Sequence, residues 1–212
     1  MSLAERLNAL RLSLPPTARL LAVSKTVGLQ AIQEALDADQ RDFGENYAQD
    51  LRDKAAALPS ATWHFIGRLQ RNKAKYVARA ASWVHAIDHI EQVEALHALR
   101  AGPPLRALVA VNLAQEATKG GVSSAAVMPL VEAATAYDQV QIVGLFTMPP
   151  MAEDPAANIP FYEALADLAR QGRRAGHLLT ELSMGTSADA AVAAAHGATW
   201  VRVGTALFGA RS

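Results

Sequence analysis

The sequence alternates between short apolar runs and longer segments with helical periodicity. Runs such as RLLAVS (19–24), TWHFIG (62–67) and VQIVGLF (140–146) are rich in β-branched and aromatic residues, which favour strands. Each run precedes a helical pattern, for example residues 29–38 after the first and 70–80 after the third. Because a helix between two strands acts as a crossover connection, this alternation predicts parallel strands.

Eight such strands are expected, at residues 19–24, 41–44, 62–67, 83–88, 105–113, 140–146, 178–184 and 199–203. Helices are expected at residues 29–38, 46–58, 70–80, 89–99, 123–137, 161–173 and 188–196, with a short helix after the last strand. Eight units of this kind predict an α/β fold, a single TIM-type (β/α)8 barrel with an extra N-terminal helix. A doubly wound open sheet is the competing architecture. The 212 residues suffice for one domain, which we expect to span residues 1–212.

Composition excludes several classes of function. The sequence contains no cysteine, which rules out disulfides, thiolate metal sites and thiol nucleophiles. Its 20 basic residues balance 20 acidic ones, so we expect no general attraction to nucleic acid or to an anionic membrane. The six histidines lack the spacing of zinc sites, and we expect no metal. No segment has the pattern of a signal peptide or the length of a membrane span, which predicts a cytoplasmic protein.

Polar residues occur at or near the ends of most of the expected strands. In barrels of parallel strands, the functional residues lie at the carboxyl ends of the strands. The residues concerned are Lys25, Asn46, His64, Asp88, Asn112, Ser183 and Arg202. We expect them to gather at one end of the barrel.

Lys25 directly follows the apolar run LLAVS. A lysine at a strand end is commonly a solvated boundary residue. The alternative is a desolvated amine whose lone pair attacks a carbonyl group. The position of Lys25 is compatible with both interpretations.

Two glycine-containing loops give the strongest signal for a ligand. They follow the seventh and eighth strands and contain Ser183, Gly185, Thr186 and Ser187 in LSMGTSAD, and Gly204 and Thr205 in RVGTALFG. Backbone N–H groups at the start of a helix bind phosphate, and the loops after strands seven and eight are the usual phosphate site of this barrel. Helix capping by Thr186 or Ser187 is the alternative, but the two loops together favour a phosphate.

Three further segments have two interpretations each. Arg202, in the strand TWVRV, needs a buried partner, either a carboxylate or a cofactor. Asn46, in FGENY, either contacts a ligand or caps a helix. The segment ATKGGV around Lys119 is either an ordinary surface loop or a mobile flap.

Long and specific motifs run through nearly the whole sequence. They are LLAVSKT, FGENY, WHFIGRLQRNK, VHAID, VNLAQEATKGGV, GLFTMPP and ELSMGTSADAAVAAAHGATWVRVGTALFG. With these motifs the chain resembles the YggS/PROSC family of pyridoxal 5′-phosphate (PLP) homeostasis proteins. That family is similar to the barrel domain of alanine racemase, a fold-type III PLP protein.

The resemblance implies a role for each candidate residue. It implies that PLP is the cofactor and that Lys25 forms the internal aldimine with it. It places Arg202 at the pyridine nitrogen and Asn46 near the ring. It implies that the phosphate is surrounded by Ser183, Gly185, Thr186 or Ser187, Gly204 and Thr205.

These roles favour a carrier of PLP over a catalyst. An arginine that stays protonated does not readily give a proton to the pyridine nitrogen, so the ring remains a weak electron sink. The sequence ends at Ser212, directly after the eighth unit, so we expect no second β-rich domain of the kind that completes alanine racemases. We therefore expect a monomeric, non-catalytic protein that buffers PLP or delivers it to apoenzymes, with Lys119 as a candidate for assisting release. A weak PLP-dependent amino-acid racemase, and a sugar-phosphate barrel enzyme without PLP, are the alternatives.

Overall fold

The eight strands form a closed parallel barrel in sequential order, β1 to β8, with β1 paired to β8. The computed structural model describes residues 1–116 and 119–209. The strands are β1 (Arg19–Val23), β2 (Asp42–Glu45), β3 (Thr62–Phe65), β4 (Trp83–Ile87), β5 (Leu105–Ala110), β6 (Val140–Phe146), β7 (Glu181–Thr186) and β8 (Trp200–Val203). Closure confirms the predicted TIM-type barrel and excludes the open sheet.

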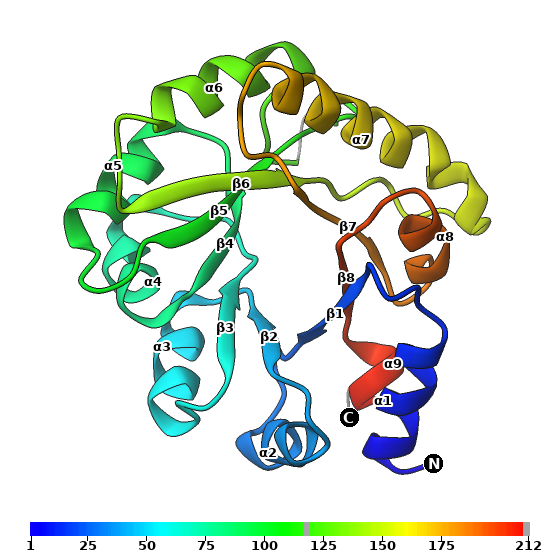
Figure 1. Ribbon diagram of the computed structural model, residues 1–212. Coiled ribbons are helices and arrows are strands. Elements are labelled where there is room, and N and C mark those ends of the chain that lie inside the picture. The colour runs from blue at the N-terminus through cyan, green and yellow to red at the C-terminus, as the bar shows by residue number, and fades with distance from the viewer. Residues whose placement is uncertain (117–118, 210–212) are drawn as a thin grey trace.

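Helices surround the barrel as an outer ring (Figure 1). They are α1 (Leu3–Leu12), α2 (Leu29–Asp37), α3 (Ala48–Ala57), α4 (Ala74–Ala80), α5 (Ile90–Leu99), α6 (Val127–Ala134), α7 (Ile159–Arg174), α8 (Ala190–Ala195) and α9 (Thr205–Phe208). Short 3-10 turns, η1 (Arg71–Lys73), η2 (Ser124–Ala126) and η3 (Pro155–Asn158), lead into α4, α6 and α7. Within the described ranges, no helix is both long enough and apolar enough to cross a membrane.

The extra N-terminal helix is confirmed as α1. It begins with a capping box, in which the Ser2 hydroxyl accepts from the Glu5 amide and the Glu5 carboxylate accepts from the Ser2 amide. Its buried residues, Leu3 and Leu7, belong to the main hydrophobic core. The last helix lies beside it (Figure 1), and Arg6 Nε donates to the carbonyl of Leu207 at 2.6 Å.

Two apolar clusters fill the described part of the molecule. The larger lies between the strands and the helices, where it includes Phe43, Trp63 and Phe65. The smaller comprises Leu21, Trp83, Leu108, Val143 and Trp200, each from a different strand. Because neighbouring residues of a strand point to opposite faces, this second set is the packing inside the barrel.

Several predicted boundaries were wrong. The fifth strand ends at Ala110, not at residue 113, because the chain turns away after a single bridge between Val111 and Val122. The seventh strand occupies residues 181–186 instead of 178–184, and Leu178 is exposed. Ser123 does occupy the predicted N-cap position, but it precedes the 3-10 turn η2 and its side chain makes no capping bond.

Candidate functional site at the carboxyl ends of the strands

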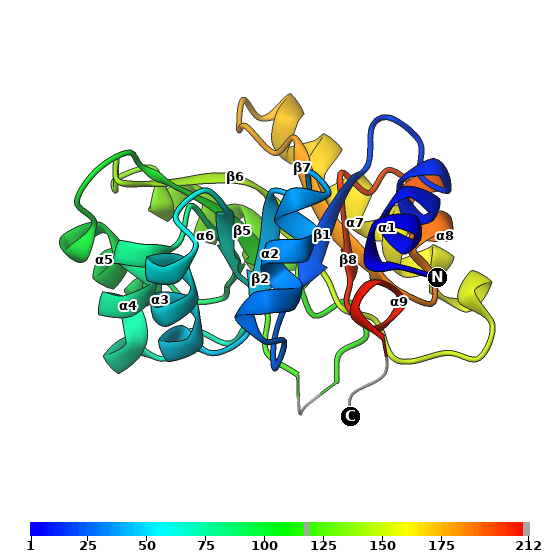
Figure 2. The ribbon, with the colours of Figure 1, turned by 90° about the horizontal axis from the view of Figure 1, so that it is seen from below.

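Two hollows lie at the carboxyl ends of the strands, where the sequence predicts the site. Figure 2 shows the barrel from its side, with the loops that follow β5 and β6 at one edge. A hollow of about 70 Å³ lies between β1 and β8 and is lined by Val23, Lys25, Thr26, Val27, Gly204, Thr205, Phe208 and Gly209. A larger hollow of about 280 Å³ is lined by residues in or just after β2 to β6, among them Asn46, Asp88, Asn112 and Phe146. Of the polar residues predicted to gather at this end, Asn46, Asp88 and Asn112 line the larger hollow and Lys25 the smaller one. The other three, His64, Ser183 and Arg202, are buried in the strands and line neither hollow.

Lys25 lies in the smaller hollow beside Gly204 and Thr205. The residue before it, Ser24, continues the β1 ladder by donating its amide to Gly44 O at 3.0 Å. The chain then turns at Thr26, which has a left-handed φ of +65°. Such a conformation is uncommon for a non-glycine residue, and here it ends the strand and leaves Lys25 half-buried in the hollow.

A buried ion pair supports the backbone just before Lys25. Glu45 is fully buried, and its Oε1 accepts from Ser24 Oγ at 2.6 Å and from Lys54 Nζ at 2.7 Å. Lys54 Nζ also donates to the Ser24 carbonyl at 2.8 Å. This ion pair was not predicted from the sequence. Its signal in the sequence is a glutamate inside the FGENY motif and a lysine nine residues later, on the following helix.

The two predicted phosphate loops meet in the structure. Gly204, after β8, donates its amide to Ser187 Oγ in the loop after β7 at 3.3 Å. Thr186, Ser187 and Thr205 are exposed. The Thr186 amide and hydroxyl both donate to Asp189 Oδ1, at 2.6 and 3.1 Å. Helix α8 has no side-chain cap, so the capping alternative is wrong for Thr186 and Ser187.

Gly185 allows β7 to lie close against α8. Its φ is +83°, and a Cβ atom built there would be only 2.4 Å from the Cβ of Ala193. A side chain at this position would collide with the helix and would also require a strained backbone. Only a glycine fits here, and it lets the chain continue from β7 into the loop with Thr186 and Ser187.

Arg202 is buried and points into the barrel from β8. Its Nη1 donates to Ser183 Oγ at 2.9 Å and its Nη2 to the Thr147 carbonyl at 3.0 Å, with the Phe146 ring 4.6 Å away. Burial lowers the pKa of Arg202 to about 10, which still leaves it charged at neutral pH. In the described residues no carboxylate forms an ion pair with it, so the partner predicted for this arginine is not a neighbouring acid.

Asn46 lines the larger hollow, and the capping alternative for it was wrong. Helix α3 begins only at Ala48, its cap position is Tyr47, and no side chain caps it. Asn46 Oδ1 is buried and has no hydrogen-bond partner among the described residues. A buried amide oxygen without a partner costs free energy unless a ligand or water satisfies it. Its position therefore fits a polar ligand in the hollow.

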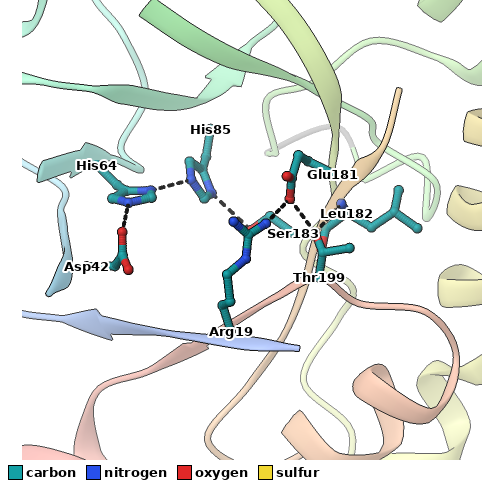
Figure 3. A network of polar contacts seen from close by, with 8 residues as sticks. All are labelled: Arg19, Asp42, His64, His85, Glu181, Leu182, Ser183 and Thr199. Atoms are coloured by element: carbon teal, nitrogen blue, oxygen red, sulfur yellow. Dashed lines mark hydrogen bonds and ion pairs between the residues drawn. The ribbon is translucent and has the colours of Figure 1, made fainter. Parts of the chain in front are cut away.

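A chain of polar side chains crosses the barrel interior beneath these hollows (Figure 3). Asp42 Oδ1 lies 3.0 Å from His64 Nε2, and His64 Nδ1 lies 2.9 Å from His85 Nε2. His85 Nδ1 in turn lies 3.0 Å from Ser183 Oγ, which also contacts Arg202. His64 had been placed among the residues of the strand ends, but Asp42 and His85 were missed. The sequence signal for both is a polar residue within a short strand that is otherwise mostly buried, Asp42 in DFGE and His85 in WVHAI.

Lys119 lies on the rim of the larger hollow and is held by several contacts. Its ammonium group forms an ion pair with Glu116 at 2.7 Å and donates to the carbonyls of Met148 and Pro149, both at 3.2 Å. Asn112 holds the same loop by donating to the carbonyls of Glu116 and Lys119. Two residues of the segment interpreted as a loop or flap, 117 and 118, lie outside the described residues.

Comparisons with known proteins agree on one family. The sequence profile described as alanine racemase, N-terminal domain, matches residues 1–212. The chain is 43% identical over 205 residues to a protein of Pseudomonas aeruginosa named pyridoxal phosphate homeostasis protein, covering 93% of this chain and 86% of that one. An Escherichia coli protein with the same name is 38% identical over 205 residues, covering 93% of this chain and 87% of that one.

Solved structures lead to the same result. PipY of Synechococcus elongatus, solved with PLP bound, is 38% identical and superposes with a TM-score of 0.88 over 98% of this chain and 100% of its own. Together with the match along the full sequence, these relatives show that the chain belongs to the family of the alanine racemase N-terminal domain.

Proposed function

We propose that the protein binds PLP at the carboxyl ends of its strands, as a Schiff base on Lys25, and buffers or delivers it. The observation that carries this proposal is the shared hollow in which Lys25 lies beside Gly204 and Thr205. The same hollow thus contains the Lys25 amine, which can condense with the aldehyde of PLP, and the backbone of Gly204 and Thr205, whose amides can bind its phosphate. The names of the relatives, and PLP in the PipY structure, support the same cofactor.

The remaining polar groups have complementary tasks in this proposal. Arg202 directs its remaining N–H groups toward the ring nitrogen, and Asn46 Oδ1 accepts a hydrogen bond at the ring. Ser187, Gly204 and Thr205 bind the phosphate, while Ser183 holds Arg202 in place. Gly185 and Thr186 give the phosphate loop its shape. When bound, PLP supplies an aldehyde that condenses reversibly with amines.

Reduction with borohydride followed by peptide mass mapping tests the attachment. We expect one pyridoxyl adduct, on the peptide that contains Lys25, and none in a Lys25→Arg variant, which keeps the charge but cannot form the linkage. Lys119→Arg is the matched control, because it changes a second lysine near the site and leaves the adduct on Lys25. An adduct on any other lysine of the wild-type protein would overturn the assignment.

We propose carriage of PLP rather than amino-acid racemisation. With its pKa lowered only to about 10, Arg202 remains protonated and keeps the ring nitrogen unprotonated. Incubation with single amino-acid enantiomers is expected to show no loss of optical activity beyond that caused by free PLP. Racemisation above that background would restore the catalytic alternative.

We also propose that residues 1–212 act as one PLP-binding domain, as a monomer in the cytoplasm, and that apoenzymes receive the cofactor. Light scattering after gel filtration is expected to give the mass of one chain. Mixing the loaded protein with a PLP-dependent apoenzyme is expected to restore its activity. Lys119 is the candidate for assisting release, although its ammonium group is already paired with Glu116. If a Lys119→Ala variant transferred PLP at the wild-type rate, Lys119 would have no role in release.

A further inference from the structure

The direction of every hydrogen bond in the buried polar chain follows from its two ends. Arginine has only donors, so Arg202 must donate to Ser183 Oγ. An ionised carboxylate only accepts, so His64 Nε2 must donate to Asp42 Oδ1. A neutral imidazole carries one donor and one acceptor, which leaves His64 Nδ1 to accept from His85 Nε2. His85 Nδ1 then accepts from the Ser183 hydroxyl.

The surroundings keep both histidines neutral, as this arrangement requires. Both imidazoles are fully buried, and His64 stacks on Trp83 with ring centroids 5.3 Å apart and meets Trp200 edge-on at 4.9 Å. Burial lowers the pKa of His64 despite its bond to Asp42. The pKa of His85 is lowered much further, by burial and then by the nearby His64, Arg202 and Arg19.

The two ends of the chain lie at different ends of the barrel. Asp42 is the first residue of β2 and its side chain is 28% exposed, in a basal hollow of about 380 Å³ that Arg11, Arg19 and Arg41 also line. Arg202 is the third residue of β8, two positions before Gly204 in the proposed cofactor site. The interior thus connects a carboxylate open to solvent with a buried guanidinium two residues before Gly204 of the proposed site.

We propose that Asp42, His64, His85 and Ser183 form one directed hydrogen-bond chain that holds Arg202 in place for the ring of PLP. Asp42 then acts as a positioning residue from the far end of the barrel. Without its terminal acceptor, the donor on His64 is unsatisfied and the tautomers of both histidines are no longer fixed. The Ser183 hydroxyl then no longer has a fixed acceptor at His85, so its orientation at Arg202 is no longer fixed either. The functional part of this proposal rests on PLP binding, whereas the tautomers do not.

The tautomers can be tested in the protein without PLP. Two-bond 1H–15N correlation spectra distinguish Nε2–H from Nδ1–H imidazoles and from imidazolium. We expect His64 and His85 both as neutral Nε2–H tautomers at neutral pH, and mixed tautomers in Asp42→Ala. Asp42→Asn keeps an acceptor oxygen and is expected to restore the wild-type spectrum. A neutral Nδ1–H tautomer, or a charged imidazole, at either wild-type residue would overturn the directed chain.

The effect on the site is tested by the rate at which PLP leaves the loaded protein, followed by absorbance. Loss of one anchoring hydrogen bond predicts roughly three- to tenfold faster release from Asp42→Ala, and release from Asp42→Asn close to that of the wild type. Asp39→Asn is the matched control, because this exposed carboxylate lines the same basal hollow outside the chain. Equal release from Asp42→Ala and wild type would overturn the positioning role. A wild-type protein that binds no PLP would instead overturn the proposed function, with the tautomer result still standing.

Discussion

Asp189 is the residue on which the loop between β7 and α8 depends. Its Oδ2 accepts from Asn158 Nδ2 at 2.9 Å and from the Tyr162 hydroxyl, while its Oδ1 accepts from the Thr186 amide and hydroxyl. One carboxylate therefore joins η3 and α7 to the loop that carries Thr186 and Ser187. Burial alone would raise the pKa of Asp189, but these donors together hold it below its ordinary value of 3.8.

The lowered pKa of Asp189 predicts a specific loss of stability in acid. The folded protein binds this proton less tightly than the unfolded chain does, so the stabilisation is complete above the ordinary pKa of 3.8. It is lost as the pH falls through the folded-state value. Tyr162→Phe removes one donor and brings the folded-state pKa of Asp189 closer to 3.8, so the loss in acid is expected to be smaller and to end at a higher pH. The free energy of unfolding should also fall by about 2 kcal/mol at neutral pH, as measured by urea denaturation.

Asp167→Asn is the control for this measurement. Asp167 lies on α7 like Tyr162, but its side chain is 55% exposed and pairs with Arg170 on the next turn of the helix. Its substitution is expected to leave the acid limb of the stability curve unchanged. Identical acid limbs for Tyr162→Phe and the wild type would show that Asp189 does not govern this transition.

At the scale of elements, α1 stabilises the end of the chain that carries part of the site. It packs beside α9, which begins at Thr205, and Arg6 bonds the Leu207 carbonyl. A helix of four residues is too short to be stable without such packing. The N-terminal helix therefore supports the site without contributing a residue to it.

Leu7 is the residue of α1 that best tests this support. It is 1% exposed, so Leu7→Ala is expected to lower the free energy of unfolding by about 3 kcal/mol. Leu12 lies on the same helix but is 79% exposed, and Leu12→Ala is expected to change it by less than about 0.5 kcal/mol. Denaturation midpoints measured with and without PLP provide the comparison. Equal losses for the two variants would contradict the packing role of α1.

The sequence predicts an element well where a local residue pattern determines it. It predicts poorly those contacts that depend on how the strands are arranged in the closed barrel. The sixth strand, 140–146, was predicted with its observed bounds, because a continuous apolar run identifies a buried strand. Lys25, Gly204 and Thr205 were placed correctly at strand ends that meet. The contact of His85 with Ser183 joins residues 98 positions apart, and it depends on strand tilt and register. No local pattern specifies that pairing, which explains why the interior chain was missed.

At the scale of the whole molecule, PLP is expected to stabilise the fold, because its proposed site joins β1 to β8, where the barrel closes. A ligand that binds only the folded state at about 100 times its Kd adds about 2.7 kcal/mol. For a domain of this size, that raises the Tm by about 5–10 °C. Differential scanning calorimetry with increasing PLP measures the shift. Pyridoxal, which lacks the phosphate, is the control and is expected to raise the Tm less.

The one-way order of the interior chain restricts which residues can replace its ends. With a donor at one end and an acceptor at the other, each group between them has a complementary neighbour. If a lysine or arginine replaced Asp42, both ends would donate, so His64 and His85 would both have to change to the Nδ1–H tautomer. Ser183 Oγ would then accept from His85 as well as from Arg202, and its own proton would lose its acceptor. The basal face of the barrel is therefore not free to exchange its charge independently of the site at the opposite end.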